Sequence, residues 1–174
     1  MFFAIHQSNH TLALRNYLPP QFFQTLRSST TFTIDQLIDE VARWRSRPIV
    51  TIAWRNLPLG LFGARVATPD RDYIIFEAHT PRVHADHTKA HELGHIIAGH
   101  PAIVITEETP IDEAISLIHK RSTRTQTYQE EEAEALASAI QTYLLQQCGW
   151  NALTHRTATA PVWSDLAFGL GLDK

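Results

Sequence analysis

The residues best suited to chemistry form the pattern H-E-x-x-H, which runs from His91 to His95. On a helix, residues four apart lie on the same face, so His91 and His95 can direct two imidazole rings to one point. Neutral imidazoles are common zinc ligands. Glu92 lies about 100° further round the helix, where its carboxylate can reach a metal-bound water without binding the metal. The pattern predicts a zinc hydrolase in which Glu92 takes the proton from that water.

The third metal ligand is not part of this segment. Metzincins carry it in the extended pattern H-E-x-x-H-x-x-G-x-x-H. Here Ala98 occupies the position of that glycine and Pro101 the position of that histidine. An ordinary amphipathic helix with incidental histidines remains the alternative interpretation of the motif. A metal site therefore requires a third ligand from another part of the chain.

A second helix, predicted from about Tyr128 to Gln147 with Gly149 just beyond its end, offers candidates for this ligand. Its first turns carry four acidic residues: Glu130, Glu131, Glu132 and Glu134. At about 100° per residue, Glu130 lies nearest the apolar face of this helix and Glu131 points to solvent. A buried carboxylate needs a charged partner or a metal, so Glu130 is the preferred ligand.

Other interpretations of the acidic residues stay open. Glu132 and Glu134 are alternative ligands. Thr127 to Glu130 also matches the capping box T-x-x-E, which would explain Glu130 without a metal. If Glu130 is the ligand, Glu134 is expected to accept a hydrogen bond from a ligand histidine.

The elements before the motif indicate an α+β fold. Thr33 to Gln36 is a capping box at the start of a helix. Three strand-like runs follow, at residues 49–54, 59–68 and 73–76, and we expect a small antiparallel three-stranded meander. This sheet should pack against the H-E-x-x-H helix and the acidic helix. The predicted organisation is an N-terminal arm at 1–32, a domain at 33–149, and a C-terminal tail at 150–174 that packs on it.

Composition limits the function classes. The chain has 174 residues, 44% of them hydrophobic, and a net charge of −3, so we expect one core and no direct nucleic-acid binding. Cys148 is the only cysteine, which excludes a disulfide and a zinc site built from cysteines. The first residues do not resemble a secretion signal, and no apolar run is long enough to span a membrane. We therefore expect a soluble cytoplasmic protein without a membrane partner.

The chain resembles the ImmA/IrrE-type zinc metallopeptidases, a gluzincin-like family. Residues 88–95 read T-K-A-H-E-L-G-H and match the family pattern T-x-A-H-E-L-G-H. Residues 130–137 read E-E-E-A-E-A-L-A and are similar to the family pattern E-x-E-A-N-x-F-A. Glu134 and Leu136 depart from that pattern, because they stand in place of its asparagine and its aromatic residue.

The resemblance implies a zincin-like minimal metallopeptidase fold and one Zn²⁺ per chain, held by His91, His95 and Glu130. It also implies that the substrate is a regulatory protein, such as a helix-turn-helix repressor, cleaved at a specific site. Residues 1–32 do not form a convincing helix-turn-helix, so we expect that repressor to be cleaved in trans.

A peptidase of this kind uses Glu92 as general base and needs a group that stabilises the oxyanion. Four residues are candidates for this group: Tyr128, His100, His119 and His155. The alternative function is a non-catalytic regulatory or sensor module that binds a metal and keeps the zincin fold.

Overall fold

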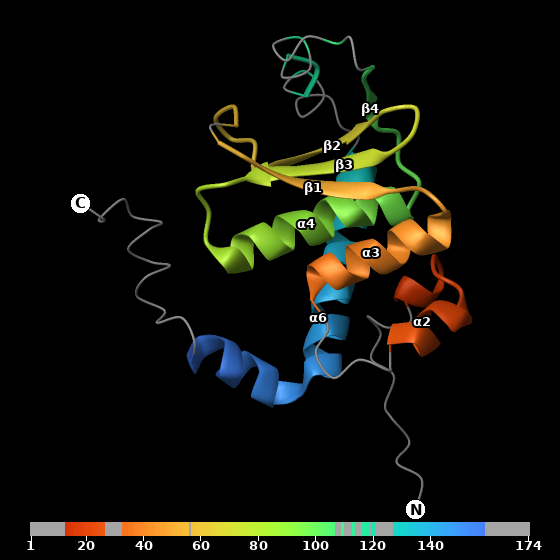
Figure 1. Ribbon diagram of the computed structural model, residues 1–174, viewed down its shortest axis with the longest axis vertical. Coiled ribbons are helices and arrows are strands. Elements are labelled where there is room, and N and C mark those ends of the chain that lie inside the picture. The colour runs from red at the N-terminus through yellow and green to blue at the C-terminus, as the bar shows by residue number, and fades with distance from the viewer. Residues whose placement is uncertain are drawn as a thin grey trace, which may run out of the picture.

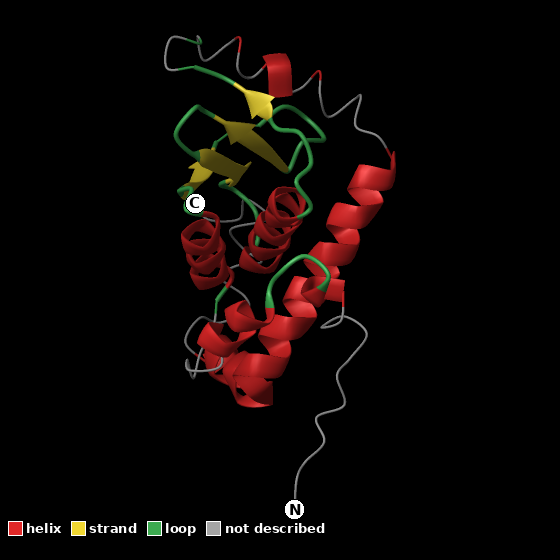
Figure 2. Ribbon diagram, turned by 90° about the vertical axis from the view of Figure 1, so that its right-hand side faces the viewer, coloured by secondary structure: helices red, strands yellow, loops and turns green. Residues whose placement is uncertain are grey.

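The computed structural model describes residues 13–26, 33–55, 57–106, 109, 113, 116–118, 120 and 127–158, and it has the expected mixed α and β structure (Figure 1). Its elements are α2 (Pro20–Leu26), α3 (Ile34–Arg45), β1 (Ile49–Trp54), β2 (Gly63–Ala67), β3 (Asp72–Glu77), α4 (Arg82–Ile97), β4 (Ile103–Val104) and α6 (Thr127–Ala158). One sheet lies over α3 and α4, and the long α6 runs past the other side of α4 (Figure 2). Helix α4 contacts β2, β3, α3 and α6, so it is the central element.

The start of α3 confirms the predicted capping box. The Thr33 side chain accepts a hydrogen bond from the backbone N–H of Gln36, and the Gln36 side chain accepts one from the backbone N–H of Thr33. The helix ends at Ser46, whose φ of 51° is left-handed. Its apolar side faces the core, as the spacing of Ile34, Leu37 and Ile38 predicts.

The predicted antiparallel meander is wrong. The described sheet has four strands in the order β1-β3-β2-β4. Strand β3 pairs antiparallel with β2 but parallel with β1, and β4 pairs parallel with β2. The continuous apolar run from Tyr73 to Phe76 suits a strand with both faces covered: Ile74 belongs to the main core and Ile75 to a smaller cluster. The run at 59–68 forms a strand only at Gly63–Ala67, and β4 has two residues.

Helix α6 is longer than predicted. It continues through Gly149 to Ala158 instead of ending near Gln147. A glycine inside a helix costs only about 1 kcal/mol relative to alanine, and the next proline is Pro161, so nothing local forces an end at Gly149. Residues 159–174, which make up most of the predicted tail, lie outside the described part of the chain. Neither α6 nor another described helix has a stretch apolar enough to cross a membrane.

The main hydrophobic core lies between the helices. It joins buried side chains of α3, α4 and α6 with those of residues 13–26. Leu14, Leu18, Phe22 and Phe23 belong to this core, so the described part of the N-terminal segment packs on the domain. A smaller cluster, which includes Val66, Ile75 and Ile118, lies at the sheet.

A buried carboxylate ties the sheet to the end of α3. Asp72, at the start of β3, is only 1% exposed. Its oxygens lie 2.7 Å from Arg45, 3.2 Å from Arg47 and 3.6 Å from Arg65. Burial favours the neutral carboxyl, but the hydrogen bond from Arg45 and the charge of Arg65 outweigh it, and the pKa of Asp72 is lowered from 3.8. This cluster therefore stabilises the fold above pH 3.8, and its contribution is lost as the pH falls below that value.

Replacing Asp72 with alanine is predicted to destabilise the protein by about 3–5 kcal/mol, because three guanidinium groups lose their common buried partner. The measurement is the free energy of unfolding in urea. Asp70→Ala is the matched control, because Asp70 pairs with Arg71 at the surface and should contribute much less. Equal losses in the two variants would contradict this role for Asp72.

Candidate metal centre

Helix α4 holds the two histidines of the H-E-x-x-H motif together. It begins at Arg82 and places His91 and His95 one turn apart, with their ring centroids 4.9 Å apart. Their Nε2 atoms are 3.2 Å apart. His95 is 9% exposed, so this pair lies at the edge of the interior.

Helix α6 brings Glu130 to the same point. The nearest carboxylate oxygens of Glu130 lie 3.2 Å from His91 Nε2 and 3.5 Å from His95 Nε2. Two ligand atoms of a tetrahedral zinc, each about 2.0–2.1 Å from the metal, are about 3.3 Å apart. The two nitrogens have this separation, and each has one of the two Glu130 oxygens, Oε2 for His91 and Oε1 for His95, at nearly the same distance. Within the described part of the chain this is the one group that could hold a metal ion.

Gly94 allows this close approach of α4 and α6. A Cβ atom at Gly94 would lie 2.8 Å from the backbone oxygen of Ala133 and 3.2 Å from the Cβ of Leu136. Such distances require one of the helices to shift. The glycine of H-E-L-G-H is thus a packing requirement, because it lets α6 pass near enough for Glu130 to reach the histidines.

Glu134 lies behind His91, as expected for a hydrogen-bond partner. Its Oε2 atom is 3.2 Å from His91 Nδ1 and 3.3 Å from His87 Nε2. The Nδ1 atom of His87 lies 3.3 Å from the side-chain oxygen of Gln141. His87 therefore contacts Glu134 and Gln141 rather than the group of three donors.

His95 has a corresponding partner that sequence reasoning did not find. Its Nδ1 atom lies 2.9 Å from Nδ1 of His100, and His100 Nε2 lies 2.9 Å from Oε2 of Glu132. The signal in the sequence was a histidine five residues after His95, beyond a glycine. Gly99 has a φ of +72°, and the chain turns there so that the His100 N–H donates to the His95 carbonyl oxygen.

These partners suit a tautomer of each candidate ligand histidine in which the proton is on Nδ1. A carboxylate only accepts, so His100 Nε2 carries a proton and its Nδ1 accepts from His95 Nδ1–H. In the same way, Glu134 accepts from His91 Nδ1–H. In these tautomers each histidine presents an Nε2 lone pair to the other and to Glu130, and a cation between the three groups would relieve their repulsion. Without a cation, a proton on His91 Nε2 would serve the same contact with Glu130.

Glu132 and its donors are coupled electrostatically. The hydrogen bonds from Tyr17 and then from His100 stabilise the carboxylate and lower the pKa of Glu132 from its ordinary value of 4.5. The same contact, together with burial, raises the pKa of Tyr17. Glu132 is therefore an anion at neutral pH, as the proton assignment requires.

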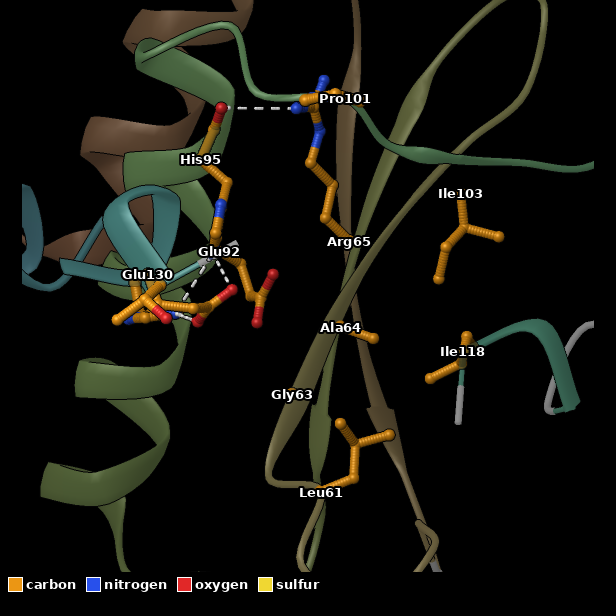
Figure 3. A pocket seen from close by; sticks show the side chains of 12 residues that line it. Leu61, Gly63, Ala64, Arg65, Glu92, His95, Pro101, Ile103, Ile118 and Glu130 are labelled. Carbon is orange, nitrogen blue, oxygen red and sulfur yellow. Dashed lines mark hydrogen bonds and ion pairs between the residues drawn. The ribbon is translucent and has the colours of Figure 1, made fainter. Parts of the chain in front are cut away.

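A cleft of about 340 Å³ opens beside the three donors. Figure 3 shows Glu92, His95 and Glu130 on one side of the cleft, with Gly63 and Ala64 of β2 opposite them. Glu92 is 8% exposed, and a Cβ atom added at Gly63 would lie 3.2 Å from its Oε1. The same Cβ atom would collide with Cγ2 of Thr88, so the glycine lets β2 approach α4 at Thr88 and Glu92 beside the cleft.

Of the four oxyanion candidates, the structure describes the side chains of His100 and Tyr128, and neither is placed as an oxyanion donor at the cleft. The His100 ring is occupied by His95 and Glu132, so it is not placed as an oxyanion donor. Tyr128 is 59% exposed, and its hydroxyl accepts a hydrogen bond from Gln129. His119 lies outside the described residues, as does the side chain of His155. Glu131, the glutamate expected to face solvent, is exposed.

Comparison with known proteins identifies no relative of this chain. No protein-family model matches the chain, and no curated protein or solved structure is significantly similar to it. The interpretation of this site therefore depends on its geometry and chemistry.

Gly94→Ala is predicted to lower both thermal stability and metal affinity, because its Cβ would collide with the Ala133 carbonyl and push α6 and Glu130 outward. The direction of the change in stability is informative, because replacing a glycine with alanine inside a helix otherwise stabilises a protein by about 1 kcal/mol. The measurements are the melting temperature and a Zn²⁺ titration against a chromophoric chelator. A more stable variant with unchanged affinity would contradict the proposed close packing.

Proposed function

We propose that this protein is a zinc-dependent peptidase in which His91, His95 and Glu130 hold the metal. One observation carries the proposal: the Nε2 atoms of His91 and His95 and the carboxylate of Glu130 converge beside Glu92 in an open cleft, at separations close to those between zinc ligands. Two imidazoles and one carboxylate, with a fourth position for water, are the ligands of many catalytic zinc sites. This donor set fits zinc, and the absence of sulfur ligands favours a catalytic over a structural site.

The cleft supplies the other part of the chemistry. Bound zinc lowers the pKa of a water molecule and polarises a carbonyl group. Glu92 follows His91 on α4 and lines the same cleft as the three donors. Its carboxylate accepts a proton from the attacking water and returns it to the leaving amine. Its burial limits competing contacts with bulk solvent.

The shape of the cleft suits an extended peptide. Strand β2 pairs with β3 along its whole length, whereas only Val66 and Ala67 pair with β4. Among the described residues, the edge at Gly63 to Arg65 has no partner strand on the β4 side, and these residues line the cleft. A substrate strand can hydrogen-bond to such an edge. Apolar side chains of Leu61, Ile103 and Ile118 line the same space.

The resemblance to ImmA/IrrE metallopeptidases suggests the substrate. We propose that it is a regulatory protein, such as a helix-turn-helix repressor, bound in trans. The alternative function is a metal-binding regulatory or sensor module without peptidase activity. The position of Glu92 in the cleft favours the enzyme, because a sensor does not need a general base beside its metal.

Glu92→Gln separates these functions. The zinc-loaded chain is incubated with a library of proteome-derived peptides, and new termini are identified by mass spectrometry. We expect the wild-type chain to cleave a reproducible set of sites and Glu92→Gln to lose at least about a hundredfold in rate, because the general base is removed. Zinc content should be unchanged, since Glu92 is not a ligand in this proposal.

Glu131→Gln is the matched control, since Glu131 is an exposed glutamate of α6. It should cleave like the wild-type chain, and a zinc chelator should abolish both activities. Identical cleavage by wild type and Glu92→Gln would rule out the proposed catalytic role. Zinc binding without any cleavage, also when a co-expressed repressor is offered, would favour the sensor function.

A further inference from the structure

The contacts behind His95 extend further than those behind His91. The chain of hydrogen bonds runs from His95 to His100 and from His100 to Glu132. It continues to Tyr17, whose hydroxyl donates to the other carboxylate oxygen of Glu132. Tyr17 is 115 residues away from Glu132 in sequence, so this chain connects the N-terminal segment to a ligand of the candidate metal site.

His100 is held in place by the backbone around it. The Arg65 guanidinium donates to the His100 carbonyl oxygen at 2.6 Å and to the His95 carbonyl oxygen at 3.3 Å. Arg65 also lies 3.6 Å from the buried Asp72. The His100 ring is buried, with 7% of the residue exposed, so it has few conformations other than the one that meets His95.

Glu132 is the residue in this series of hydrogen bonds whose side chain has the most conformational freedom. Its side chain is 35% exposed, whereas that of His100 is 6% exposed. An exposed glutamate on a helix has several accessible rotamers, and fixing one of them costs conformational entropy. Tyr17 holds the second carboxylate oxygen, so it favours the rotamer in which the first oxygen accepts from His100.

Tyr17 itself is positioned by the packing of its segment. Leu14 and Leu18 are buried in the main core, and the N–H of Leu18 donates to the Leu14 carbonyl at 2.9 Å. Further along, the ring of Phe23 meets that of Tyr143 on α6 edge to face, with centroids 5.7 Å apart. The hydroxyl of Tyr17 therefore reaches Glu132 only when residues 13–26 are docked on the domain.

We propose that Tyr17, Glu132 and His100 are positioning residues for His95, and that docking of residues 13–26 strengthens metal binding through them. His100 holds the His95 ring in the orientation and tautomer that direct Nε2 to the site. Glu132 fixes the proton of His100, and Tyr17 fixes Glu132. This inference rests on the proposed metal site but not on peptidase activity. It adds a coupling between the N-terminal segment and the metal.

The first test is the Zn²⁺ dissociation constant, measured by chelator competition. Loss of a partner of a ligand histidine typically weakens metal binding about 10–100-fold, and we expect this range for His100→Phe and Glu132→Ala. Tyr17→Phe removes one hydrogen bond and should weaken binding about three- to tenfold. The matched control is Glu131→Ala, at an adjacent exposed glutamate, which should bind zinc like the wild-type chain.

A double variant shows whether Tyr17 acts on the metal site through Glu132 or only through a general destabilisation of the fold. In the Glu132→Ala background, Tyr17→Phe should have no further effect on zinc affinity, because the partner of the hydroxyl is already absent. If the two substitutions lowered zinc affinity independently and their effects added, the proposed series of hydrogen bonds would be contradicted. The melting temperature of each variant without zinc identifies losses that come from the fold instead.

Thermodynamic linkage supplies a second readout. If docking of residues 13–26 strengthens zinc binding, zinc must stabilise the docked segment by the same factor. Amide hydrogen exchange in residues 13–26 should slow on adding zinc to the wild-type chain, and clearly less in Glu132→Ala. Exchange that is indifferent to zinc in both proteins would overturn the coupling.

The outcomes separate this inference from the proposed function. Zinc binding by the wild-type chain, with Glu132→Ala and His100→Phe as tight as Glu131→Ala, would overturn the positioning chain and leave the metal site intact. No zinc binding by the wild-type chain would overturn both. Weakened binding in all three positioning variants, with a normal control and the expected double variant, would support the inference.

Discussion

The close crossing of α4 and α6 is the constraint on which the candidate site depends. Gly94 removes the side chain that would separate the helices, and Ala133 fills the contact from the other side. Both ligand histidines come from α4, and the third donor and two supporting carboxylates come from α6. A small outward shift of α6 would therefore move Glu130, Glu132 and Glu134 together. The sheet and the buried Asp72 cluster support α4 from its other side.

The spacing of the glutamates on α6 explains their different contacts. At about 100° per residue, Glu130 and Glu134 lie about 40° apart, whereas Glu132 lies about 160° from each of them. Glu130 and Glu134 can thus approach the Nε2 and the Nδ1 of the same histidine, His91. Glu132 lies on the other flank of the crossing and reaches His95 only through His100. In this way the Nδ1 of His91 contacts a carboxylate directly, and the Nδ1 of His95 is linked to one through the imidazole of His100.

Local sequence patterns were sufficient to predict features that depend on the capping and the periodicity of a single helix. The capping box at Thr33 is confirmed, and Glu131 is exposed as the periodicity of the acidic helix predicted. Glu130 reaches the histidines, but its side chain is 42% exposed and therefore lies at the surface of the site, not in the interior. The group formed by His91, His95 and Glu130 could be proposed because helix periodicity places residues four apart on one face.

The rest depends on tertiary packing that no local pattern records. The order of the strands depends on which edges pair, and the parallel pairs β1–β3 and β2–β4 join segments that no local pattern connects. His100 reaches His95 through a turn at Gly99, where helical periodicity no longer applies. Tyr17 meets Glu132 only because its segment joins the main core, and nothing in the sequence around Tyr17 indicates that contact.

The zinc content of the purified chain, beside Glu130→Ala and Glu131→Ala, tests the central claim most directly. The three proteins are equilibrated with a small excess of Zn²⁺ at neutral pH, freed of unbound metal, and analysed for zinc and protein. The account predicts about one zinc per chain in the wild type and in Glu131→Ala, and much less in Glu130→Ala. No bound zinc in the wild type would contradict it. The contacts of His91 with Glu130 and Glu134 would then be hydrogen bonds without a metal, and the peptidase proposal would fall with the metal.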